Sequence, residues 1–74
     1  MVELDSDKVK KIRERLGITQ EQAAVKAGFK SRQQWNQIER GDGKITLATL
    51  NAIGAALGMS DERRLLRLNQ EKKR

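Results

Sequence analysis

The chain contains no cysteine, no histidine and no proline, and its 74 residues include only one tryptophan and one phenylalanine. The absence of cysteine and histidine excludes disulfide frameworks, Cys/His zinc sites, thiol nucleophiles and histidine-based acid–base catalysis. The Asp, Glu, Lys and Ser residues that remain are scattered and form no convergent set. We therefore expect neither an enzyme nor a bound cofactor or metal ion.

Long apolar runs are also missing from the sequence. No stretch of 18 or more apolar residues occurs, so nothing in the chain is long enough to cross a bilayer as a helix. The opening residues, MVELDSDKVK, lack the apolar segment of a signal peptide. These features lead us to expect a cytoplasmic protein without a membrane partner.

The length and the charge limit what the chain can be. Residues 1–74 fit one domain, and 16 basic against 10 acidic residues give a net charge of +6, which favours a polyanionic partner. Residues 63–74 hold six basic residues and one acidic residue, and so contribute five of these six charges. The rest of the chain is almost neutral, so any nucleic-acid function depends on where individual side chains lie.

Apolar residues recur at helical spacing along the whole chain, without the alternation of a strand. Capping residues and glycines divide it into five expected helices, which begin near Asp5–Asp7 and at Thr19, Ser31, Thr46 and Ser60. The first four end near Gly17, Gly28, Gly41 and Gly58. Thr19 with Gln22, and Ser31 with Gln34, each match a capping box. The sequence predicts an all-α bundle whose last helix, about 60–74, runs into a basic tail.

The expected core consists of one apolar stripe on each helix. The side chains predicted to point inward are Val9, Ile12 and Leu16; Trp35 and Ile38; and Leu47, Leu50, Ile53 and Leu57.

Residues 19–40 form the most informative stretch. Two short helices joined by a glycine-containing turn are typical of a helix-turn-helix, whose second helix enters the major groove of DNA. Ala24 is small enough for the two helices to cross closely. Opposite Trp35 and Ile38, the second helix carries amides and arginine but no acid. Gln and Asn can bond adenine and Arg can bond guanine, although the same side chains also suit a neutral solvent-exposed face.

Three segments resemble the Cro/C1-type (XRE-type) helix-turn-helix of lambdoid phage repressors and related bacterial regulators. They are TQEQAAVKAG, SRQQWNQIERG and TLATLNAIGAALGMS, and the resemblance covers Val9 to Ser60. It implies a five-helix, lambda-repressor-like DNA-binding domain. It further implies base contacts from Arg32, Gln33, Asn36 and Gln37, a phosphate contact from Gln20, and a pair between Glu39 and Arg13. Arg40 and Lys44 are either further phosphate contacts or solvated charges.

The chain departs from the family pattern at two places. The turn 28–31 holds one extra residue, which shifts the expected register of the second helix by about one position. Small Ala23 and Ala27 replace larger apolar residues, and we expect Phe29 and Trp35 to fill that volume. Stacking of Trp35 on a base is the alternative, but its spacing from Ile38 is that of a core residue.

Apolar residues near the end of the chain exceed what so small a bundle must bury. In the family this region joins two subunits, so Met59, Leu65, Leu66 and Leu68 are expected either to form a dimer or to seal the core of the monomer. The leading hypothesis is a sequence-specific regulator of double-stranded DNA, acting as a dimeric repressor on a palindromic operator. The antitoxin of a toxin–antitoxin pair is the alternative. A surface-binding peptide is disfavoured, because the capping boxes indicate an independently folded body.

Overall fold

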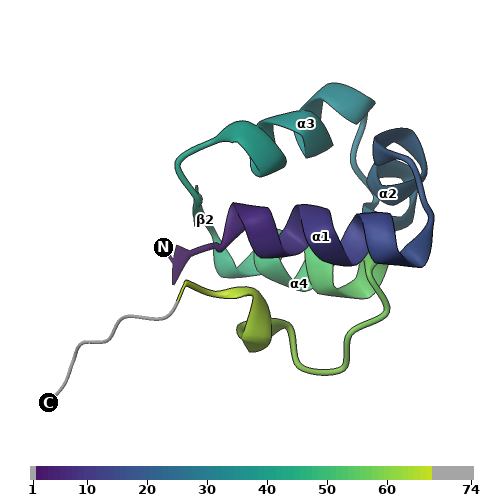
Figure 1. The fold of residues 1–74 in the computed structure, drawn as a ribbon. Helices are drawn as coiled ribbons and strands as arrows, with labels where there is room; N and C mark the ends of the chain where they lie inside the picture. Colours follow the sequence, from purple (N-terminus) through teal and green to yellow (C-terminus); the bar gives the residue numbers. More distant parts are fainter. Residues whose placement is uncertain (1, 68–74) are drawn as a thin grey trace, which may run out of the picture.

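Four α-helices make up most of the computed structural model, which describes residues 2–67 (Figure 1). They are α1 (Ser6–Leu16), α2 (Gln20–Ala27), α3 (Arg32–Arg40) and α4 (Leu47–Ala56). A 3-10 helix, η1 (Glu62–Leu65), follows α4. Helix α3 lies along one edge of the molecule, and η1 lies on the other side of α1 and α4. The helical character and the helix-turn-helix are as predicted.

The prediction of a fifth α-helix is wrong. The expected helix from Ser60 into the basic end is reduced to η1, and residues 68–74 lie outside the described range. The chain leaves η1 at Leu66 in an extended conformation, and Leu66 forms an antiparallel bridge with Leu4. Arg67 N donates to the Glu3 carbonyl at 2.8 Å. Pairing with the N-terminal segment therefore overrides the local helical pattern, because these backbone groups bond across the fold instead of along a helix.

A two-stranded antiparallel sheet was not predicted. Strand β1 (Val2–Glu3) pairs with β2 (Lys44–Ile45), with Val2 opposite Ile45. The adjoining loop is held closely, since Leu4 N donates to the Gly43 carbonyl at 2.6 Å and Gly43 has a positive φ of 86°. The sheet thus ties the N-terminus to the loop that follows α3.

Local capping signals determine where α1 and α2 begin. Asp5 caps α1 through Lys8 N, and Thr19 and Gln22 form the predicted capping box with bonds of 3.0 and 2.9 Å. The second capping box is wrong, because Ser31 makes no side-chain cap bond and the Gln34 oxygen instead accepts from Lys30 N at 2.6 Å.

The core lies among α1, α2 and α4, with α3 packed on α1 and α2, and η1 packed on α4 and α1. Its largest fully buried side chains are Val9, Trp35, Leu50, Ile53, Leu65 and Leu4. Two predicted core residues are exposed: Leu16 is 51% exposed, and Leu47 is more so. On α1 the buried stripe runs through Val9 and Arg13 instead of Leu16. Leu47 is the first residue of α4, and helical side chains lean toward the N-terminus, so it extends past the packed turns.

Candidate nucleic-acid interface

The turn between α2 and α3 places the two helices against each other. Gly28 ends α2 in the left-handed conformation, with φ of 78°, and Phe29 N donates to the Ala24 carbonyl at 2.9 Å. Ala23 and Ala24 are buried in the packing of α2 against α3 and α4. Small side chains here let the helices approach closely. This is the geometry of a helix-turn-helix, with α3 as its second helix.

Trp35 anchors α3 to the body. Its side chain is fully buried, and its ring lies 6.0 Å from that of Phe29, centroid to centroid. Phe29 packs against the core from outside, and the filling of the volume beside Ala23 and Ala27 by the two rings stays a prediction. The burial of Trp35 leaves no ring face for stacking on a base.

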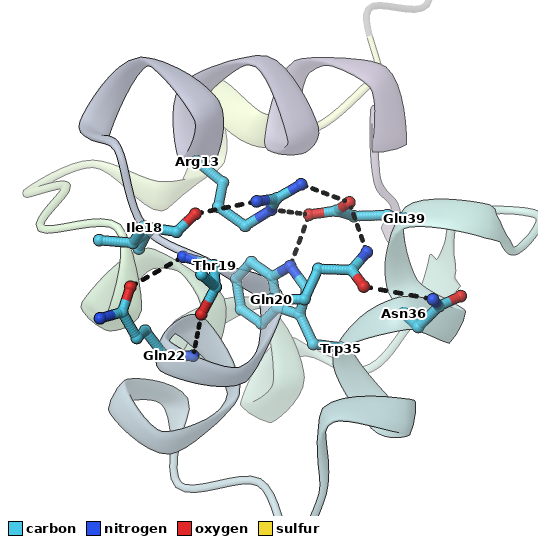
Figure 2. A network of polar contacts seen from close by, with 8 residues as sticks. All are labelled: Arg13, Ile18, Thr19, Gln20, Gln22, Trp35, Asn36 and Glu39. Carbon is cyan, nitrogen blue, oxygen red and sulfur yellow. Dashed lines mark hydrogen bonds and ion pairs between the residues drawn. The ribbon is translucent and has the colours of Figure 1, made fainter.

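A buried carboxylate lies at the centre of a polar network that joins α1, α2 and α3 (Figure 2). Glu39 Oε2 accepts from Arg13 Nε and from Trp35 Nε1, each at 2.6 Å. The Glu39 side chain is 3% exposed and that of Arg13 is 11% exposed. Arg13 Nη1 also donates to the Ile18 carbonyl at 2.9 Å. The pair implied by the family resemblance is confirmed, and it fixes the orientation of α3 relative to α1.

The environment of Glu39 favours its ionised form. Burial by itself raises the pKa of this carboxyl, but hydrogen bonds from Arg13, Gln20 and Trp35, together with the charge of Arg13, outweigh it. The resulting pKa is below the ordinary value of 4.5. Glu39 is therefore an ionised acceptor at neutral pH, with all of its partners donating.

Gln20 and Asn36 extend this network toward the surface. Gln20 Nε2 donates to Glu39 Oε1 at 3.0 Å, and Gln20 Oε1 accepts from Asn36 Nδ2 at 3.2 Å. Both side chains are half-buried. The sequence analysis did not identify this chain of contacts, nor the bond from Trp35 to Glu39. The spacing of Trp35 and Glu39, four residues apart on one helix, could have indicated the latter.

The outer face of α3 carries side chains without protein partners. Arg32, Gln33, Gln37 and Arg40 are exposed and make no side-chain hydrogen bond or ion pair with other residues of the range 2–67. Their donors and acceptors are thus free for a ligand. Lys44 is also exposed, in β2, and a cleft bordered by Gln37 and Lys44 connects α3 with this strand.

The residues expected at a dimer interface differ in how far they are buried within one chain. Leu65 is fully buried within one chain and offers no surface to a second subunit, because it fills the core beneath α4 and α1. Met59 and Leu66 are half-buried and pack against the core from outside. Leu68 lies outside the described residues.

Comparison with known proteins agrees with this geometry. A family model described as a helix-turn-helix matches residues 9–65. The chain belongs to this Cro/C1-type helix-turn-helix family of DNA-binding regulators. Comparison with curated proteins gives no significant match, and neither does comparison with solved structures. Within residues 2–67, no helix is long and apolar enough to cross a membrane.

Proposed function

We propose that the chain is a sequence-specific repressor that occupies a palindromic operator as a dimer, with α3 in the major groove. The observation that carries this proposal is the outer face of α3. It presents arginine and amide side chains without a competing acid, on a helix held in place by the buried network around Glu39. Such side chains distinguish base pairs by bidentate hydrogen bonds in the major groove.

The side chains divide by the role we assign to them. Arg32, Gln33 and Gln37 contact base edges directly, and Asn36 contacts a base while bonded to Gln20. Arg40 and Lys44 contact phosphates and position the helix. Gln20 keeps one Nε2 hydrogen that Glu39 does not use, and this hydrogen is available to a phosphate at the N-terminus of α2.

Selection of bound duplexes from a random pool tests this function. We expect a defined site with twofold symmetry, because a dimer places two copies of α3 in successive major grooves. Affinity for that site should fall steeply with salt as counterions are released. A pool that shows no enrichment, or binding that is unaffected by salt, would reject the proposal.

Dimerisation is proposed to use Met59 and Leu66, with Leu68 as a further contact. Met59 and Leu66 are partly exposed apolar side chains beside η1. Sedimentation of the protein alone and on operator DNA measures the stoichiometry. One chain per half-site and two per operator are expected, and a single chain bound to a symmetric site would contradict this assignment.

A second candidate function is that of an antitoxin, which binds a protein as well as DNA. The observation that favours it is an apolar area away from α3. Val25 is 73% exposed, and a cleft nearby is lined by Leu16, Ile18, Lys26, Ala56, Leu57 and Gly58. Co-expression with the product of an adjacent gene separates the two functions. A stable complex that Val25→Glu disrupts, while DNA binding is retained, would favour the antitoxin.

A further inference from the structure

The carboxylate of Glu39 determines which end of the Gln20 amide faces it. An ionised carboxylate only accepts hydrogen bonds, so the Gln20 atom 3.0 Å from Oε1 must be the nitrogen. A flipped Gln20 would bring its oxygen against the carboxylate oxygen. Arg13 and Trp35 both donate to Oε2, and Arg13 Nη2 also donates to Oε1 at 3.3 Å, so the carboxylate is held by donors besides Gln20. The amide of Gln20 therefore has one allowed orientation in this network.

The orientation of Gln20 in turn determines that of Asn36. With its nitrogen on Glu39, Gln20 directs its oxygen toward α3, where it accepts from Asn36 Nδ2 at 3.2 Å. Figure 2 shows the Asn36 nitrogen facing Gln20 and its oxygen on the far side. If Asn36 turned over, two carboxamide oxygens would face each other. The fixed polarity thus passes from a buried charge to a side chain of the second helix of the motif.

We propose that Glu39 and Gln20 act as positioning residues which present the carboxamide oxygen of Asn36 to the major groove, so that Asn36 selects adenine. The inference rests on the proposed function. Adenine and cytosine present an exocyclic amino group in the major groove, which donates to this oxygen, whereas guanine presents the acceptor O6 there. Adenine also offers N7 as an acceptor for the second Nδ2 hydrogen of Asn36, which cytosine does not.

Base preference at a single pair measures this effect. At the pair that Asn36 contacts, identified by the Asn36→Ala variant, we expect adenine to be favoured over guanine by about 5- to 150-fold. Gln20→Met removes the amide but leaves the contacts of Glu39 with Arg13 and Trp35. It should reduce this ratio several-fold, because Asn36 is then free to turn over, while the preferences at other pairs stay. Combining Gln20→Met with Asn36→Ala should give the same ratio as Asn36→Ala alone, because Gln20 acts only through Asn36.

Gln22→Met is the matched control. It removes an amide from the same end of α2, where Gln22 caps Thr19, without touching Glu39 or Asn36. A loss caused only by weakening of α2 would appear in both variants, whereas loss of the adenine preference in Gln20→Met alone supports positioning. If Gln20→Met keeps the adenine preference, the positioning inference is wrong although the regulator function stands.

The free protein provides a readout that does not depend on DNA. A through-hydrogen-bond NMR coupling is expected between the Asn36 side-chain nitrogen and the Gln20 carboxamide carbon. A coupling in the reverse sense, from the Gln20 nitrogen to the Asn36 carbon, would overturn the inference. Equal affinity of the wild-type chain for all duplexes would instead reject the proposed function itself.

Discussion

Trp35 Nε1 donates a hydrogen bond to Glu39 Oε2, 2.6 Å away and one turn further along α3. The only tryptophan is thus both a core side chain and a donor to a buried charge. The same carboxylate also accepts hydrogen bonds from Arg13 of α1 and Gln20 of α2. The bond from Trp35 therefore connects the buried side of α3 to the contacts that orient α3 relative to α1 and α2.

Substitution of Trp35 separates these two contributions. Trp35→Ala should cost about 3–5 kcal/mol of unfolding free energy, because it removes a large buried side chain. Trp35→Phe keeps most of the volume and should cost about 1.5–3 kcal/mol for the bond to a charged acceptor. Urea unfolding followed by circular dichroism measures both. A folded Trp35→Ala protein of wild-type stability that no longer binds DNA would contradict the assignment of Trp35 to the core.

Removal of Arg13 should be among the most destabilising changes. Arg13→Ala leaves Glu39 buried without its opposite charge, at an expected cost of about 3–5 kcal/mol. The double variant Arg13→Met with Glu39→Leu should recover much of this loss, since both charges are then gone. Arg63→Ala, which breaks an exposed pair with Asp61, is the control and should change stability by less than about 1 kcal/mol. If Arg13→Ala and Arg63→Ala lower the unfolding free energy equally, the buried pair of Arg13 with Glu39 does not stabilise the fold as described.

Acid should weaken the fold through Glu39. The pKa of Glu39 in the folded protein is below the ordinary value of 4.5. Between these two pKa values the unfolded chain binds more protons than the folded protein does. The stabilisation is fully present above a pH of about 4.5 and is lost as the pH falls through the folded pKa. Unfolding free energies measured across this range should fall less steeply in Glu39→Gln than in the wild type. Asp61→Asn, at an exposed site, should change the slope less, because solvent screens its pair with Arg63.

Loss of a base contact and loss of a phosphate contact should have different effects on DNA binding. Gln33→Ala or Gln37→Ala should remove about 1–3 kcal/mol of discrimination at particular base pairs. Lys44→Ala should weaken all sequences alike and lower the salt slope by about one unit. A panel of operators with single-base changes, titrated at several salt concentrations, distinguishes the two. Unchanged preferences in both glutamine variants would show that α3 does not determine sequence specificity.

Gly43 should not tolerate a side chain. Its φ is 86°, and an added Cβ would lie 2.5 Å from the Leu4 carbonyl oxygen. Gly43→Ala should therefore cost more than the roughly 1–2 kcal/mol of a left-handed alanine, because the backbone of Leu4 must also move. Gly58→Ala is the matched control, since Gly58 has φ of 70° but open space around it. Thermal unfolding compares the two, and equal losses would indicate that the close contact with Leu4 contributes nothing.

The sequence by itself determined the features that depend on neighbours within one turn of helix. Asp5, the box of Thr19 and Gln22, and the left-handed Gly28 are set by contacts three to five residues apart. Burial of Trp35 followed from its spacing along one helix. Local capping and periodicity thus sufficed for four helices and for the helix-turn-helix.

Tertiary structure decided everything that joins distant parts of the chain. Leu66 and Arg67 pair with the N-terminal segment instead of extending a helix, because these backbone groups meet only in the folded protein. The pair of Glu39 with Arg13 came from family resemblance, but its extension to Asn36 through Gln20 depends on three helices meeting at one carboxylate. The sequence does not show how the oxygen and the nitrogen of an amide side chain are oriented. Only the buried charge beside them fixes which end donates and which end accepts.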